Sequence, residues 1–366
     1  MSPKKYLLRN LFFPKIIKID YPGIIISKTT RKYSFKEKTR RQIYIFEDII
    51  SDLQNNTINS LGENNAKKIW GEIGTSLGKF YVSKSRIKPV PKIILEESIK
   101  YILKVFSTGG ATCMTKFSVS KNAEIIKLNG SGNIVCRKTG INEFRVCFGK
   151  EILEAMTGYN YATEGICKKS CDKICHLKFE KINKEKSKKN IEIYDDSKDQ
   201  KYFETLKNID ENIPLKSFDE FVKFKKIKLN DTDKLVLFDK LCIMPWPLPL
   251  DIIYYIYEKH NCEHLIEKSL YNTINSFKKT LLKNSKDNEI EILKNLFSVL
   301  GWGIFDIRSS KNVTKCSIKY PISIQKNKNN FYSLVIKAFL EAFLRKKFTK
   351  ITKKVSLENI LFLEFS

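Results

Sequence analysis

An internal repeat constrains the fold of this chain more than any other feature of its sequence. The segment ILEAMTG at 152–158 follows Phe144 at the same interval at which FLEAFLR at 339–345 follows Phe331. Three further pairs of similar segments occur upstream, and their offset shortens steadily, from about 210 residues near the start to about 187 at this pair. Two copies of one domain, with small deletions in the second, explain this pattern. A repeat that is overlooked leads to the wrong fold.

The length of the chain also suggests two domains, since 366 residues exceed one domain of ordinary size. We expect a first domain over 1–180, a linker over 181–214 and a second, degenerate domain over 215–366. The predicted linker is charged and poor in apolar residues, which is typical of a solvated connector.

Each copy predicts the same order of elements. Turn residues at DYPG (20–23) and at LNDTD (229–233) indicate a β-hairpin at the start of each copy. The other elements expected in the first copy are helices over 43–56, 65–82 and 142–157, and a β-hairpin around 113–137 that turns at LNGSGN. Antiparallel strands segregated from helices predict an α+β fold, with two tandem copies of an antiparallel sheet packed on helices.

Composition indicates a globular protein. Hydrophobic residues make up 42% of the chain and aromatic residues 12%, which is enough to form buried cores. No apolar run reaches the ~20 residues that a membrane span requires. The amino terminus is basic, but its apolar positions are interrupted too early for a secretory signal. We therefore expect a cytoplasmic location.

The net charge of +27 is compatible with nucleic-acid binding, because basic surfaces bind phosphates by releasing counterions. The lysines are, however, dispersed along a chain that is rich in Lys, Ile and Asn throughout, as in proteins of A/T-rich genomes. This pattern favours a compositional explanation over a nucleic-acid partner, which the charge leaves open.

A cluster of possible metal ligands occurs in TEGICKKSCDKICHLKFE at 163–180. It contains Glu164, Cys167, Cys171, Cys175 and His176. Nine cysteines without an export signal indicate reduced thiols, which serve metal binding or redox chemistry where they cluster. Thiolates suit zinc, and a metal that cross-links a short hairpin contributes to its folding free energy.

Two alternatives to a metal remain open for this cluster. The thiols could form a reversible disulfide and act as a redox sensor. The cluster could also be purely structural, with Cys175, Leu177 and Phe179 alternating onto a buried face. The corresponding segment of the second copy, at 351–365, contains no cysteine, so we expect one site per chain.

The element order, with the closing unit EFRVCFGKEILEAMTGYNYATEGICKKSCDKICHLKF, resembles the 4-vinyl reductase domain family. Glu164 and Cys167 match its Glu-x-x-Cys, and Cys175 matches its last cysteine. The resemblance covers nearly all of the first copy and the second only weakly. It implies a ligand-binding fold shared with small-molecule sensor domains and vesicle-tethering subunits, often dimeric. Some members regulate transcription in response to aromatic compounds, some are redox sensors, and one branch is associated with vinyl reduction in bacteriochlorophyll synthesis.

The resemblance also implies a zinc site. In sensor members the ligands match Glu164, Cys167 and Cys175, with a further cysteine at the start of the preceding helix. By count that position falls near Asn142, which is not a cysteine, and a structural zinc site normally has four ligands. Cys171 is the first choice for the fourth ligand. Cys147 and His176 are the alternatives.

Two other motifs carry less weight. HNCEH at 260–264 matches the His-x-x-Glu-His pattern of one class of metalloprotease. The repeat places it at a turn between two helices, so we expect a polar turn. GTSLGKF at 74–80 lacks the spacing and the Ser or Thr of a phosphate-binding loop, and we expect its glycines to let a helix pack closely.

The sequence as a whole predicts a sensory or regulatory protein that binds zinc and an unidentified apolar small molecule. No acid–base or nucleophilic set assembles, so we expect no catalysis. The second copy is expected to pair with the first as an internal pseudo-dimer, unless two chains form a homodimer. A cysteine-based redox sensor, or an enzyme or accessory factor acting on a vinyl tetrapyrrole, is the alternative.

Overall fold

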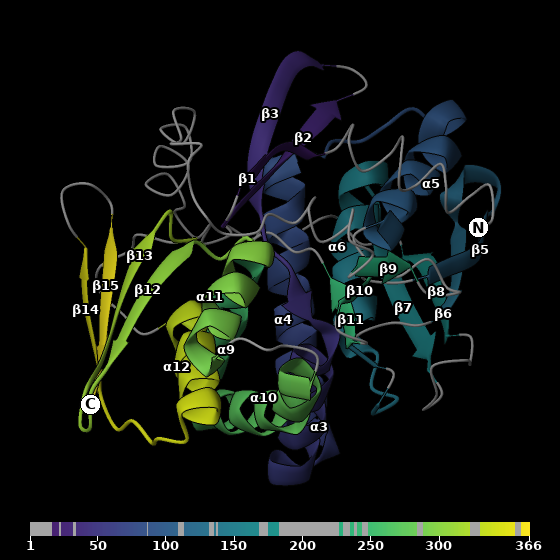
Figure 1. Ribbon diagram of the computed structural model, residues 1–366. Coiled ribbons are helices and arrows are strands. Elements are labelled where there is room, and N and C mark those ends of the chain that lie inside the picture. Colours follow the sequence, from purple (N-terminus) through teal and green to yellow (C-terminus); the bar gives the residue numbers. More distant parts are fainter. Residues whose placement is uncertain are drawn as a thin grey trace. The chain divides into compact units, whose positions relative to one another are not determined.

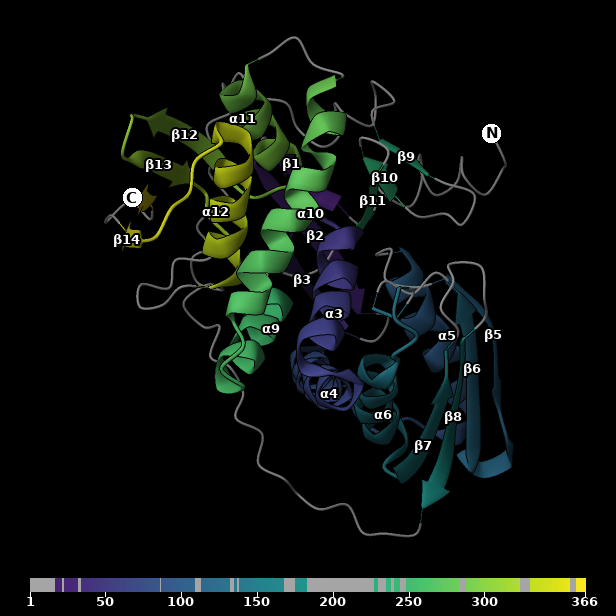
Figure 2. The same ribbon diagram turned by 90° about the horizontal axis from the view of Figure 1, so that it is seen from below.

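The fold consists of two compact units, each assembled from segments that lie far apart in the sequence (Figures 1 and 2). Unit 1 combines Met1–Phe46, Asp195–Asp251 and Glu267–Ser366, and unit 2 combines Glu47–Tyr194 and Ile252–Ile266. The computed structural model describes residues 17–21, 23–31, 34–85, 87–108, 113–131, 135–136, 138–167, 175–182, 227–229, 235–237, 240–243, 248–283, 288–322, 330–355 and 360–366. Most of the predicted linker lies outside these residues, and the boundaries of the tandem domains stay a prediction.

Two four-stranded antiparallel sheets repeat one topology. In unit 2, β5 (Cys113–Val119), β6 (Ile125–Ser131), β7 (Asn160–Ile166) and β8 (Cys175–Ile182) lie in the order β5-β6-β8-β7, and helix α6 (Glu143–Thr157) connects β6 to β7. In unit 1, β12 (Ile304–Ser309), β13 (Thr314–Lys319), β14 (Ile351–Val355) and β15 (Leu361–Phe365) lie in the order β12-β13-β15-β14, with α12 (Phe331–Leu344) between β13 and β14. The shared strand order confirms the predicted α+β fold with two copies of a sheet packed on helices.

The elements that precede each sheet also correspond. The first copy has helices α3 (Glu47–Leu61), α4 (Glu63–Ser85) and α5 (Lys92–Thr108), and the second has α9 (Leu248–Lys259), α10 (His264–Lys283) and α11 (Glu289–Val299). The sequence predicted the first two of the first copy and missed α5. Ahead of the helices, β1 (Ile17–Tyr21), β2 (Ile24–Arg31) and β3 (Ser34–Gln42) form one sheet. A second sheet joins β4 (Ile45–Phe46), β11 (Lys240–Ile243), β10 (Leu235–Leu237) and β9 (Ile227–Leu229) in that order.

The predicted turn of the β5–β6 hairpin is wrong. The segment LNGSGN begins inside β6, and the chain turns earlier, between Ser120 and Ile125. The Ser120 hydroxyl accepts a hydrogen bond from the Ile125 amide at 2.7 Å, and Asn122 adopts φ of 62°. Asparagine tolerates this left-handed conformation better than most residues, so a turn forms without glycine.

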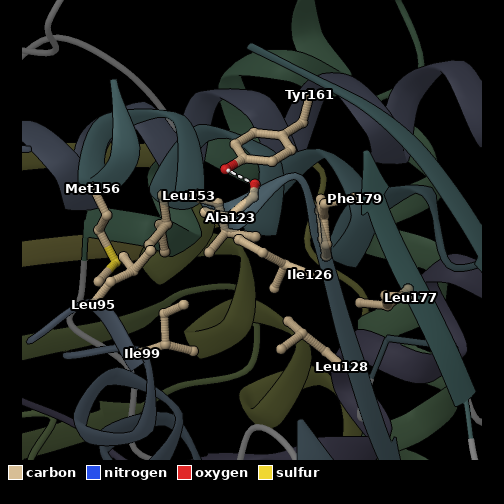
Figure 3. Close-up of a cluster of buried hydrophobic side chains, with 11 residues drawn as sticks. Leu95, Ile99, Ala123, Ile126, Leu128, Leu153, Met156, Tyr161, Leu177 and Phe179 are labelled. Atoms are coloured by element: carbon tan, nitrogen blue, oxygen red, sulfur yellow. Dashed lines mark hydrogen bonds between the residues drawn. The ribbon is translucent and has the colours of Figure 1, made fainter. Parts of the chain in front are cut away.

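The core of unit 2 lies between its sheet and helices α5 and α6 (Figure 3). Leu95 and Met156 come from the helices, and Leu128 and Phe179 from the two central strands. The alternation of buried side chains along β6 and β8 directs one face of the sheet to this core. The sheet that carries the cysteine hairpin is therefore anchored by apolar packing.

Glycines allow helices α4 and α6 to approach closely. A Cβ atom on Gly74 would overlap the Phe144 carbonyl oxygen and lie 2.9 Å from its carbonyl carbon. A Cβ atom on Gly78 would lie 2.7 Å from Glu151 Cβ. This confirms that the glycines of GTSLGKF serve helix packing.

A buried arginine connects three backbone segments of unit 1. Arg41 is 2% exposed, and its Nη2 donates to the carbonyl oxygens of Gly23, Gly301 and Tyr320 at 2.5, 2.8 and 3.0 Å. Gly303 N donates to the Gly23 carbonyl at 3.0 Å, and Gly303 adopts φ of 109°. The turn between β1 and β2 is thereby fixed to the start of the β12–β15 sheet, and the GWG glycines supply backbone conformations that other residues rarely adopt.

Among the helices that the structure describes, none is long and apolar enough to cross a membrane.

Candidate metal centre

Three cysteines from separate elements converge in unit 2. The Sγ atoms of Cys136, Cys167 and Cys175 all lie within 4.8 Å of one another. Cys136 precedes α6, Cys167 follows β7, and Cys175 begins β8. Cys136 and Cys175 are buried, and Cys167 is half-buried. Such a cluster could hold a metal ion, because soft thiolates are preferred zinc ligands.

The pairing of β8 places Cys175 in this cluster. Cys175 lies opposite Gly130 of β6, and burial alternates along β8 so that Cys175, Leu177 and Phe179 are buried. This is the alternation that the purely structural alternative to a metal site predicted from the sequence. His176 lies on the exposed face, with its Nδ1 3.0 Å from Asn129 Oδ1.

A glycine brings the strand that leads to Cys167 against the start of α6. A Cβ atom on Gly165 would lie 2.5 Å from Asn142 Nδ2 and 2.6 Å from Val146 Cγ2. Because successive strand residues alternate between faces, Gly165 and Cys167 share a face. The tight packing at Gly165 therefore fixes the place where Cys167 leaves the sheet.

Helix α3 holds the loop that carries Cys136. The Cys136 carbonyl accepts from Thr139 N at 3.2 Å, and Thr139 Oγ1 donates to Gln54 Oε1 at 2.6 Å. Gln54 Nε2 donates to the Ile141 carbonyl at 3.3 Å, and Gln54 is fully buried. Buried polar groups with several partners specify one loop conformation. The contacts of Gln54 and Thr139 therefore hold Cys136 near the ends of β7 and β8, although these hydrogen bonds do not involve the thiols.

The sulfur–sulfur distances identify what this cluster can do. Cys136 Sγ lies 3.8 Å from Cys175 Sγ, and Cys167 Sγ lies 2.7 Å from Cys175 Sγ. Two thiolates on a tetrahedral zinc ion are separated by roughly 3.8 Å, given Zn–S bonds of about 2.3 Å. The first pair fits that edge. The second lies between it and the roughly 2.05 Å of a disulfide bond, so both metal binding and disulfide formation are within reach of Cys167 and Cys175.

Hydrogen bonds and burial raise the pKa of the Cys136 and Cys167 thiols and so favour their protonated forms in the absence of a metal. Hydrogen bonds with Cys167 and Cys175, together with burial, raise the pKa of Cys136. For Cys167 the hydrogen bond with Cys136 lowers the pKa, but the hydrogen bond with Cys175 and burial outweigh it, and the pKa is raised to about 11. The positive charge of Arg145 on α6 opposes both shifts. A metal would displace these protons on binding, and Arg145 would offset part of the thiolate charge.

The structure brings together two of the ligands predicted from the sequence, Cys167 and Cys175. Glu164 is exposed on β7 opposite Lys178, and its carboxylate is not part of the group of three. Cys171 lies outside the residues that the structure describes. As a ligand set, Glu164, Cys167, Cys171 and Cys175 stay a prediction.

The other candidates for a fourth ligand also lie outside the group of three. Cys147 lies on α6 at the contact with α4, where its Sγ would be 3.6 Å from a Cβ atom on Gly71. Asn142 is buried, and its Nδ2 atom has no hydrogen-bond partner among the residues that the structure describes.

Cys136 was missed by the sequence reasoning. The resemblance placed a fourth ligand near Asn142, and Cys136 lies six residues earlier, in a loop whose course no local pattern predicts. The available signal was a cysteine beside the turn residues KTG, just before a predicted helix.

The HNCEH segment forms the predicted turn between α9 and α10. His260 Nε2 lies 2.9 Å from Glu72 Oε2, and Lys259 forms an ion pair with the same carboxylate. Across the described part of the chain, the three cysteines are the one group with metal-ligand spacing, so this turn does not assemble a metal site there.

Comparison with known proteins assigns neither a family nor a function to this chain. No family model matches the chain, and no curated protein matches it. A solved structure with weak similarity is the phenol-responsive sensory domain of the transcription activator PoxR with phenol, with a TM-score of 0.31 and 11% identity. The similarity covers 50% of this chain and 92% of that chain. At this TM-score it supports no functional assignment, and the resemblance to the 4-vinyl reductase family stays a prediction.

Proposed function

We propose that this protein binds one zinc ion through Cys136, Cys167 and Cys175 and acts as a small-molecule sensory or regulatory protein. The observation that carries the proposal is the convergence of three thiols from three separate elements within 4.8 Å. Cysteines that serve only as small hydrophobic residues do not need to lie close to one another, whereas binding of one metal ion requires that their Sγ atoms converge.

Zinc at this position would join the loop before α6 to the ends of β7 and β8. Each of these elements has a different anchor: Gln54 for the loop, Gly165 for β7 and the apolar core for β8. The zinc ion supplies a cross-link, and its binding free energy becomes folding free energy of unit 2. In this proposal Cys171 completes the tetrahedron, because Glu164 lies exposed on the face of β7 opposite to that of Gly165 and Cys167. The apolar ligand binds between sheet and helices, and the copies pair as an internal pseudo-dimer or through a homodimer.

Elemental analysis of the full-length protein tests the metal proposal. We expect about one zinc per chain, and less than ~0.2 would end it. Cys171→Ser tests the fourth ligand, since it should lower the zinc affinity by roughly tenfold or more. Glu164→Gln, on the exposed face of β7, serves as the matched control and should keep about one zinc. Unchanged zinc affinity of Cys171→Ser would exclude Cys171 as the fourth ligand.

A redox role is the second candidate, favoured by the 2.7 Å separation of the Cys167 and Cys175 sulfurs. When the metal-free protein is treated with hydrogen peroxide, we expect these two thiols to lose two protons and two electrons. The products are one disulfide and water. Peptide mapping without reductant should find the Cys167–Cys175 link, and prior addition of zinc should prevent it. Recovery of both cysteines as alkylated thiols after oxidation would contradict this role.

A further inference from the structure

The hairpin of β2 and β3 extends beyond the part of β2 that pairs with β1 (Figure 1). Strand β1 pairs with β2 only from Ile24 to Ser27, whereas β3 pairs with β2 as far as Arg31. In the order β1-β2-β3, β3 is an edge strand. The outer part of this hairpin is therefore a two-stranded antiparallel ribbon.

The ribbon concentrates positive charge far beyond the average of the chain. Residues 24–42 contain seven basic residues and one acidic residue, a net charge of +6. A net charge of +27 over 366 residues would place between one and two charges on a segment of this length. The corresponding segment of the second copy, 227–243, contains three basic and three acidic residues. A general lysine bias does not produce such a difference between equivalent elements.

The register places two of these basic residues on one face of β3. Lys38 and Arg40 occupy alternate positions of the strand, ~7 Å apart, and Lys36 lies nearer the end of the hairpin, where the register shifts between Thr29 and Arg31. Their cross-strand neighbours on that face include Ser27, opposite Arg40, and Thr29, opposite Lys38. Basic and hydroxyl residues are the usual partners of phosphate oxygens. Arg41 occupies the opposite face and serves the interior of unit 1.

We propose that the outer part of the β2–β3 ribbon binds double-stranded DNA, with the basic residues Lys36, Lys38 and Arg40 of β3 along the phosphates. The major groove of B-DNA admits a two-stranded β-ribbon, whereas the deep and narrow major groove of duplex RNA does not. An anionic membrane is the less suitable partner, because membrane-surface elements carry an apolar face. The described residues 27–31 and 34–40 contain only one large apolar residue, Phe35. The inference is independent of the zinc proposal.

Binding of the full-length protein to a labelled mixed-sequence DNA duplex tests this site. The variant is the triple substitution Lys36→Ala, Lys38→Ala and Arg40→Ala. The matched control, Lys311→Ala with Lys315→Ala and Lys319→Ala, removes the same charge from exposed positions around the β12–β13 hairpin. We expect the ribbon variant to bind DNA at least about tenfold more weakly at low salt, with a slope of log K against log salt that is smaller by roughly 2.7. The control variant should bind within about twofold of the wild type.

Several results would overturn the proposal. Equal weakening by both triple variants would show that net charge alone drives the interaction. Equal affinity of the wild type for duplex RNA would exclude insertion into the major groove. Absence of DNA binding at low salt, or binding to anionic phospholipid vesicles in its place, would also refute it. A circular dichroism melt that matches the wild type establishes that the ribbon variant is folded.

Discussion

Replacing Cys136 by serine is expected to reduce the zinc content of the purified protein from about one ion per chain to less than ~0.2. Zinc binds thiolates far better than hydroxyl groups, and the 3.8 Å contact between Cys136 and Cys175 is the one that fits a tetrahedral zinc edge. The same loss is expected for Cys175→Ser. Mass spectrometry of the intact protein under native conditions, together with elemental analysis, measures this change.

The matched control for Cys136→Ser is Cys147→Ser. Cys147 is half-buried on α6 but is not one of the three grouped thiols, so its variant should keep about one zinc. A chelator added to the wild type should lower the melting temperature of unit 2, and it should change Cys136→Ser little. Retention of zinc by Cys136→Ser, or its loss from Cys147→Ser, would show that the ion is held elsewhere.

Gly74→Ala is expected to lower the free energy of unfolding by about 2 kcal/mol, which is a large part of the stability of a typical domain. The new methyl group would overlap the backbone of Phe144, which cannot move without displacing α6. Because α6 begins beside the strand that leads to Cys167, the same displacement should weaken zinc retention. Denaturant unfolding followed by circular dichroism measures the change in stability.

Gly71→Ala controls for helix propensity on the same helix. Among the described residues, a Cβ atom there would meet Cys147 Sγ at 3.6 Å and Glu143 Cβ at 3.8 Å, which are ordinary contacts. Alanine favours the helix over glycine by up to about 1 kcal/mol, so Gly71→Ala should be neutral or stabilising. If both variants were equally stable, the close approach of α4 and α6 would not depend on Gly74.

The sequence by itself determined the repeat, the α+β class and most of the elements of the first copy. These follow from local signals: helical spacing of apolar residues over α3, α4 and α6, and turn chemistry between β1 and β2. The alternation of Cys175, Leu177 and Phe179 was predicted as part of the structural alternative to a metal site, because strand geometry fixes which residues share a face. The turn at 120–124 was missed, since the glycine-containing segment LNGSGN was assigned as the turn, whereas the chain turns earlier through Asn122.

Only the tertiary structure decided which groups meet at the candidate metal centre. Cys136 joins Cys167 and Cys175 because Gln54, more than eighty residues away along the chain, fixes its loop through Thr139. The spacing Glu-x-x-Cys could not show that Glu164 and Cys167 lie on opposite faces of the chain along β7. Glu164 is exposed there and pairs with Lys178 of β8, away from the thiols. Local periodicity depends on neighbours in sequence, whereas a ligand set depends on side-chain contacts between distant segments, and these are settled only when the chain packs.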